Sequence, residues 1–298
     1  MHYVNPGNLY VQRFGEAKTA DDILNYARFL LHESGFNGTP PVDLGQIRAR
    51  FGIPTPKLAP LKNQQGLLIN AEFGIILIKN DDPSTRQRFT EGHEFMELLF
   101  SALPSGGGWA ARQTGIFKKA TKERLCNEGA AELLMPRSLF LPRVKEKGVS
   151  FQSARQLAAE FGVSTTAALV QMARIAPGRH AVVLWRSKNK PSEFKIRVPP
   201  NQLPLFDGPV AELPPPKLRV EWGYNGPDVS FIPQDKSVPQ DSSIYRSWDS
   251  GIFMVGEDNL WLGSMKGVFK SENHPFDSDR QRLVISLLHC PGDIDCPA

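Results

Sequence analysis

The strongest constraint on the fold of this chain comes from one segment, RFTEGHEFMELLF, at residues 88–100. Read as a helix, it carries apolar side chains on nearly every face, and such a helix is stable only when other parts of the protein surround it. The same segment carries a histidine and two nearby acids, His93, Glu94 and Glu97. Because an unpaired carboxylate is costly to bury, a central helix with these side chains indicates a cation beside them.

The spacing of these residues is typical of a metal site. His93 and Glu97 are four residues apart, so on a helix they lie on one face with Cβ atoms roughly 5 to 6 Å apart. Zinc peptidases place two ligands at this spacing. Glu94 lies beside the first ligand and can reach a metal-bound water, whose pKa falls to about 7 in such sites. The pattern predicts His93 and Glu97 as ligands and Glu94 as a general base that passes a proton to the leaving amine.

A second interpretation stays open, because the dipeptide His-Glu is short enough to occur by chance. The chain contains another such pair, His32-Glu33, and there the position four residues on from the histidine is Phe36, which cannot bind a metal. The alternative to a metal site is therefore an ordinary buried helix whose histidine has a hydrogen-bond partner.

The segments around this helix predict a domain of helices and strands. Amphipathic patterns indicate helices at residues 19–35 and 42–52, and a further helix at residues 121–136. Between them, the runs GLLIN and GIILIK at residues 66–70 and 74–79 predict a pair of antiparallel strands.

The helix at residues 121–136 offers further donors for a metal. Glu123 lies near its start, and Cys126 and Asn127 follow one turn later on the same face. Glu128 and Glu132 form another carboxylate pair at helical spacing. We expect Glu128 and Glu132 to be solvated, and we expect Cys126 to pack as a small buried residue rather than to bind a metal.

Residues 151–176 have the spacing of a helix-turn-helix. The surrounding region, residues 141–200, holds eleven Lys and Arg against three Asp and Glu, and this basic charge keeps DNA binding open. However, the second helix offers only Gln171 and Arg174 as side chains that could contact DNA bases, whereas a DNA-binding helix would present several such side chains. We therefore favour a structural or protein-binding role for this helix pair.

The motifs in this chain resemble those of the ImmA/IrrE family of metallopeptidases. Members carry R-F-T-x-x-H-E-x-x-H, matched here by RFTEGHEFME, and E-x-x-A-N-x-F-A-A-E-L-L-M-P, matched by ERLCNEGAAELLMP. The resemblance covers roughly residues 20–140. It implies a zincin-like domain in which His93 and Glu123 bind zinc, Glu97 stands at the remaining ligand position, and Glu94 is catalytic.

The chain departs from the family pattern near the metal. Glu97 replaces the second histidine, and Cys126 and Gly129 replace the usual alanine and phenylalanine. A carboxylate can also bind zinc, so Glu97 can keep the site intact. Its negative charge should raise the pKa of a metal-bound water and make the ligand set more favourable to harder ions such as Mn²⁺.

From these patterns we expect an α+β fold in four parts. Residues 1–145 form the zincin-like metallopeptidase domain, with helices and a small antiparallel sheet, and residues 146–197 form the helix-turn-helix and basic segment. Residues 198–216, which contain seven prolines, are a stiff linker. Residues 217–298 form a small, mostly β domain with strand-like runs such as VSFIP and SIYRSW, and with a candidate helix in RQRLVISLL.

The resemblance implies a zinc-dependent endopeptidase that cleaves a helix-turn-helix transcriptional repressor in a stress or mobile-element response. The alternative is a catalytically weak or inactive regulator that keeps the peptidase fold and binds protein or DNA. The chain has no long apolar run and no signal-peptide pattern, and its three cysteines lack Cys-x-x-Cys spacing. We therefore expect a cytoplasmic protein without a membrane partner.

Overall fold

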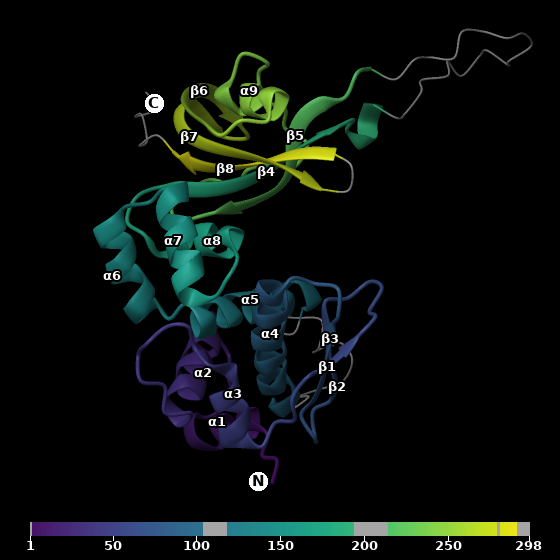
Figure 1. Cartoon of the computed structure of the whole chain (residues 1–298), viewed down its shortest axis with the longest axis vertical. Helices are drawn as coiled ribbons and strands as arrows, with labels where there is room; N and C mark the ends of the chain where they lie inside the picture. Colours follow the sequence, from purple (N-terminus) through teal and green to yellow (C-terminus); the bar gives the residue numbers. More distant parts are fainter. Residues whose placement is uncertain (1, 104–117, 194–213, 279–280, 291–298) are drawn as a thin grey trace, which may run out of the picture. The chain divides into compact units, whose positions relative to one another are not determined.

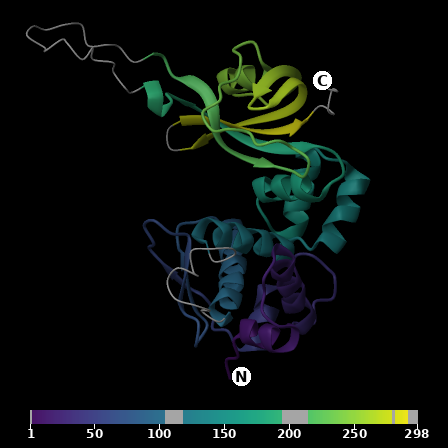
Figure 2. The same ribbon diagram turned by 180° about the vertical axis from the view of Figure 1, so that it is seen from behind.

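The computed structural model describes residues 2–103, 118–193, 214–278 and 281–290 (Figures 1 and 2). The chain forms two compact units, Met1–Gln171 and Met172–Ala298, and the boundary between them falls inside helix α8. None of the described helices combines the length and the apolar character that crossing a membrane requires.

The N-terminal unit contains helices and a small sheet. Its helices are α1 (Pro6–Phe14), α2 (Ala20–Glu33), α3 (Leu44–Phe51), α4 (Ser84–Ala102), α5 (Lys119–Leu134), α6 (Arg137–Lys147), α7 (Phe151–Phe161) and the first part of α8 (Thr165–Ile175). Its strands are β1 (Lys57–Ala59), β2 (Gly66–Asn70) and β3 (Ile75–Lys79).

The strand pair predicted from the sequence is confirmed, because β2 and β3 are antiparallel, with Leu67 opposite Leu77. The small sheet as a whole is nevertheless mixed rather than antiparallel, since β1 pairs with β3 in parallel, with Leu58 opposite Ile78. A strand of only three residues carries too short a pattern for the sequence to reveal it. The sheet order β1-β3-β2 leaves β2 at an edge of the sheet among the described residues.

Helix α4 is the central element of this unit. It packs against α5, against α1 and against strands β2 and β3 (Figures 1 and 2). Phe95, Met96, Leu98 and Leu99 are fully buried, so the predicted burial of this helix is confirmed. A helix surrounded in this way can hold polar side chains in a place where little water reaches them.

Local sequence signals explain where several helices begin and end. Thr19 and Asp22 form the capping box that starts α2, in which each side chain accepts a hydrogen bond from the other's backbone N–H group. Asp43 caps α3 by accepting the N–H of Gly45, and Ser150 caps α7 by accepting the N–H of Ser153. Gly162 ends α7 in the left-handed conformation, with φ at 63°, which glycine adopts without strain.

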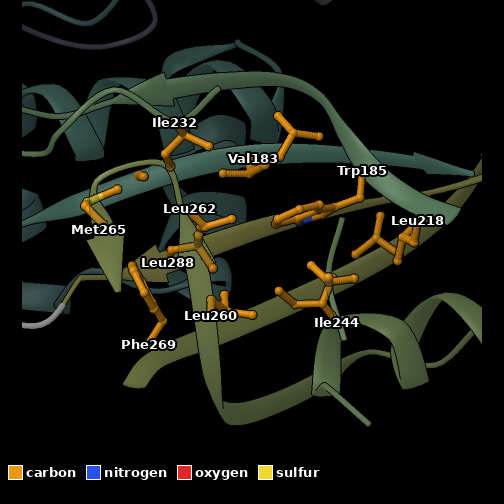
Figure 3. Packing of buried hydrophobic residues seen from close by; sticks show 14 residues of the cluster. Val183, Trp185, Leu218, Ile232, Ile244, Leu260, Leu262, Met265, Phe269 and Leu288 are labelled. Carbon is orange, nitrogen blue, oxygen red and sulfur yellow. The ribbon is translucent and has the colours of Figure 1, made fainter. Parts of the chain in front are cut away.

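The C-terminal unit is built on an antiparallel sheet. Its strands are β4 (His180–Lys188), β5 (Lys217–Asn225), β6 (Met254–Leu262), β7 (Met265–Ser278) and β8 (Gln281–His289), in the order β5-β4-β8-β7-β6. A short 3-10 helix, η3 (Pro191–Glu193), follows β4, and α9 (Ser243–Ser250) packs on β6, β7 and β8. Figure 3 shows the core between them, with Trp185, Ile244 and Phe269 buried together.

Two segments of this unit adopt the opposite structure to the one predicted. RQRLVISLL, the candidate helix, forms strand β8, in which every residue from Leu283 to Leu288 is buried. A continuous apolar run of this length is equally consistent with a buried strand and with a buried helix. SIYRSW is helix α9 rather than a strand, and Ser242 caps it by accepting the N–H of Tyr245. The run VSFIP, predicted as a strand, is irregular.

The predicted division into domains also differs from the structure. Strand β4 was assigned with the helix-turn-helix segment, but it pairs with β5 and β8, and its Trp185 lies opposite Val220 and Val284. The proline-rich segment therefore joins two neighbouring strands of one sheet and does not separate two domains. Residues 198–213 of that segment lie outside the described residues.

Replacing Gly129 with alanine should destabilise the N-terminal unit. A Cβ atom at this position of α5 would lie 2.5 Å from Met96 Sδ and 3.0 Å from Ile23 Cγ2. We expect a loss of about 1–3 kcal/mol in the free energy of unfolding, because overpacking forces neighbouring side chains to move. Urea denaturation of the full chain measures this loss.

Gly92→Ala is the matched control on the facing helix α4. A Cβ atom there would lie 3.6 Å from its nearest neighbour, Ala130 Cβ, which is an ordinary contact. Removing a helical glycine at this position should stabilise the protein by up to about 1 kcal/mol. Changes of the same sign in both variants would contradict this description of the contact between α4 and α5.

Candidate metal centre

Two packed helices bring the candidate ligands together. Helix α4 carries His93, Glu94 and Glu97, and helix α5 carries Glu123 and Cys126. The site therefore depends on the distance between the two helices, and the small side chains along their contact keep that distance short.

His93 is oriented by a hydrogen bond to Asn127 on α5. Its Nδ1 atom lies 3.0 Å from Asn127 Oδ1, which can only accept, so Nδ1 carries the proton in this arrangement. The other ring nitrogen, Nε2, then has a free lone pair and lies 3.7 Å from Glu123 Oε2. Metal-binding histidines are commonly held by such a bond to the nitrogen that does not bind the metal. The orientation of His93 therefore fits a metal ligand.

Glu97 has two polar neighbours. Its carboxylate forms an ion pair with Lys122 Nζ. It also accepts a hydrogen bond from Cys126 Sγ at 3.5 Å. Burial, together with the negative charge of Glu97, raises the pKa of the Cys126 thiol far above its ordinary value. In the absence of a metal ion, the thiol is therefore protonated, and Lys122 balances the charge of Glu97.

Three donors lie closer together than the predicted ligands His93, Glu97 and Glu123 do. One potential ligand atom from each of three residues, His93, Glu97 and Cys126, lies within 4.8 Å of the other two. Among the described residues, this is the group of three side chains close enough together to hold a metal ion. Cys126 is fully buried, as expected. Glu123 lies close to His93 but is outside this group, and its side chain is 52% exposed.

Glu94 is held in a buried position next to these donors. Its side chain lies against β2, where the backbone N–H of Leu68 donates to its carboxylate. Glycine at position 66 leaves room for it, since a Cβ atom there would lie 2.7 Å from Glu94 Oε1. Burial and the nearby charge of Glu97 raise the pKa of Glu94 to about 7. A carboxyl group with this pKa can both accept and donate a proton at neutral pH.

The second carboxylate pair on α5 does not join the site. Glu128 pairs with Arg124 on the same helix, at 2.6 Å. The expectation that Glu132 is solvated was wrong, because its side chain is buried and contacts Arg28 Nε at 3.2 Å. Arg28 comes from α2, which packs on α5, so this partner is distant in sequence and the helical pattern could not reveal it.

In the helix pair α7 and α8, one of the two residues predicted to be able to contact DNA bases is not available for such a contact. Gln171 is fully buried and donates a hydrogen bond to the carbonyl oxygen of Met135, at 3.0 Å. A side chain used inside the protein in this way cannot contact a base edge. The residue that it contacts lies 36 positions earlier in the chain, so the helical pattern could not reveal its burial.

The segment that carries the candidate site is similar to a known protein family. Residues 47–172, which include every candidate ligand, match the family model of the IrrE N-terminal-like domain. This match confirms the resemblance of residues 47–172 to the ImmA/IrrE family. No curated protein matches its sequence. A solved structure, a Mycobacterium tuberculosis transcriptional regulator, is similar with a TM-score of 0.57 and 11% sequence identity, covering 96% of this chain and 80% of that chain. At this identity the likeness shows a shared fold alone.

Sequence reasoning missed Lys122, which the structure places against Glu97. The signal was present, because Lys122 directly precedes Glu123, the third ligand that the family resemblance implies. Its Nζ also lies 5.4 Å from the centre of the Phe100 ring, so two residues of α4 hold the ammonium group in place. Any metal ion that binds Glu97 must therefore compete with this lysine.

Replacing Lys122 with alanine should strengthen metal binding. The change frees the Glu97 carboxylate and removes a positive charge that repels the ion. We expect the affinity for Zn²⁺ to rise about tenfold, which corresponds to about 1.4 kcal/mol in binding free energy. This is a fraction of the interaction energy of roughly 4 kcal/mol between two unit charges 4 Å apart at an effective dielectric constant of 20. Competition with a zinc-binding dye measures the affinity.

The matched control is Lys119→Ala, which removes an exposed lysine from the same helix, three residues earlier. It should leave the zinc affinity almost unchanged, because exposed charges are screened by salt. Equal affinities in the Lys122→Ala variant and in the unmodified protein would show that the lysine does not compete with the ion.

Proposed function

We propose that this chain is a zinc-dependent endopeptidase that cleaves a helix-turn-helix transcriptional repressor in a stress or mobile-element response. The observation that carries the proposal is the placement of His93, Glu94 and Glu97 on one buried helix, facing donors from α5. These residues lie in the IrrE N-terminal-like domain of the chain. The proposal also places the protein in the cytoplasm, where such repressors act.

The donor set fits a divalent cation. His93 presents Nε2 because Asn127 holds the opposite nitrogen, and the carboxylates of Glu97 and Glu123 supply anionic oxygen atoms. These three residues would hold the ion, with zinc as the expected metal and Mn²⁺ as a harder ion that accepts the same oxygen ligands. When bound, zinc lowers the pKa of a water molecule and polarises a carbonyl group.

Glu94 handles the proton in this mechanism. It takes a proton from the attacking water as the new C–O bond forms, and it delivers that proton to the nitrogen atom as the peptide C–N bond breaks. The hydrogen bond from Leu68 N–H and the contact with Gly66 hold the carboxyl group in one orientation. Strand β2 thus positions the general base.

The same strand offers a place for an extended substrate. Because β2 is an edge strand among the described residues, a peptide can add to it through backbone hydrogen bonds. The N–H of Leu68 points away from β3 and toward Glu94, so the edge of β2 faces the catalytic helix. Leu67 and Ile69 are exposed and supply apolar contacts for such a substrate.

One observation favours the alternative of an inactive regulator. The ion pair between Lys122 and Glu97 supplies a resident positive charge, so the fold is electrostatically balanced at Glu97 without a metal ion. In that case the domain would bind its partner protein without cleaving it. DNA binding gains no support from α8, because Gln171 is buried.

Metal content separates these functions. We expect elemental mass spectrometry to find about one zinc ion per chain in protein purified without chelators or a metal-binding tag. Glu97→Ala should lose the ion, because it removes a ligand. An unmodified protein that contains no metal, even after incubation with Zn²⁺ or Mn²⁺, would support the inactive regulator.

Glu94→Gln tests the role of the general base. Glutamine keeps the shape of the side chain but cannot accept a proton, so zinc content should be unchanged while cleavage falls by a factor of about 10² to 10⁴. Host-cell extract treated with each protein is analysed by mass spectrometry for new protein N-termini. Cleavage products that appear equally with the variant would exclude Glu94 as the base.

A further inference from the structure

Cys126 carries a thiol group that the proposed reaction does not use. Its side chain is fully buried on α5, and its Sγ atom lies 3.5 Å from Glu97 Oε1. It follows Glu123 by three residues, so both residues lie on the same face of the helix. In the family motif this position holds alanine, so no ligand at position 126 is part of the family pattern.

The distances around Cys126 are close to those that a bound ion requires. In a tetrahedral zinc site, two ligand atoms that lie 2.0 to 2.3 Å from the ion are about 3.3 to 3.8 Å apart. The ligand atoms of His93, Glu97 and Cys126 all lie within 4.8 Å of one another. Small side-chain rotations therefore suffice to place all three around one ion.

We propose that Cys126 is a metal ligand, which binds as a thiolate beside His93 and Glu97. The inference rests on the proposed metal site and gives Cys126 the third ligand position, which the proposed function assigns to Glu123. When the ion binds, the S–H bond breaks, an S–metal bond forms, and the proton leaves to the solvent. The cation then replaces Lys122 as the positive charge next to Glu97.

The thiolate determines which metal the site prefers. Thiolates are soft ligands that favour zinc and cobalt, whereas carboxylates and imidazole alone also accept Mn²⁺. With Cys126 bound, the site selects Zn²⁺ over Mn²⁺ despite the carboxylate at position 97.

Binding of the Cys126 thiolate also means that Glu123 is no longer needed as a metal ligand. Catalytic zinc keeps three protein ligands and leaves the fourth position to water. When His93, Glu97 and Cys126 hold the ion, the half-exposed Glu123 is the donor that yields its position to water.

Cobalt substitution tests the proposal directly. The full-length protein is loaded with Co²⁺, which takes the place of zinc and shows a thiolate-to-metal charge-transfer absorption in the near ultraviolet when sulfur is a ligand. We expect this band in the unmodified protein and its loss in Cys126→Ala, while Co²⁺ still binds through the other donors. Alanine is the residue of the family motif, so this variant is expected to fold.

Two controls identify the source of the band. Replacing Cys290 and Cys296 together with serine removes the other cysteines of the chain and should leave the band intact. Glu123→Gln should also keep it, because that change leaves the sulfur donor in place. Loss of the band in the Cys290 and Cys296 variant would overturn the proposal.

The competition between zinc and manganese gives a second readout. Cys126→Ala should weaken Zn²⁺ binding at least about tenfold and leave Mn²⁺ binding almost unchanged. Co²⁺ bound without a charge-transfer band would refute Cys126 as a ligand and leave the proposed peptidase intact. A protein that binds no Co²⁺ at all would refute both.

Discussion

The packing of α4 against α5 is the contact on which the rest of this structure depends. Gly129 lets α5 approach Met96, and Gly92 faces Ala130 at the same contact. This short distance brings Asn127 to His93 and places the donors of both helices around one point. A larger side chain at position 129 would push α5 away from Met96 and move the donors of the two helices apart, even with every candidate ligand still in the sequence.

The charges at this contact favour a cation beside the carboxyl groups. Glu94, Glu97 and Glu123 place three carboxyl groups near one histidine, and the first of them is almost completely buried. Lys122 supplies one positive charge, whereas a divalent metal ion supplies two. The lysine therefore stabilises the metal-free protein, and the balance between the two cations decides how readily the site is loaded. The same side chain links the proposed peptidase to its inactive alternative.

Several elements show why sequence patterns predicted the N-terminal unit better than the C-terminal one. Helix α4, the cap at Thr19 and the β2–β3 pair follow local rules, in which each residue's neighbours lie within a few positions along the chain. Strand β8 has no such signature, because the burial of every residue from Leu283 to Leu288 removes the alternation that identifies a strand. The pairing of β4 with β5 joins segments on either side of a proline-rich stretch, and nothing in composition indicates that such segments share a sheet.

By itself, the sequence determined the relation between His93, Glu94 and Glu97, since helical geometry places residues four apart on one face. Its motifs also identified the ImmA/IrrE family. Only the tertiary structure decided that Lys122 pairs with Glu97, that Cys126 converges with the ligands, and that Arg28 covers Glu132. These contacts join residues that are 25 to 104 positions apart, and their formation depends on which helices pack together. That choice is made by the burial of apolar surface over the whole unit and not by any local spacing.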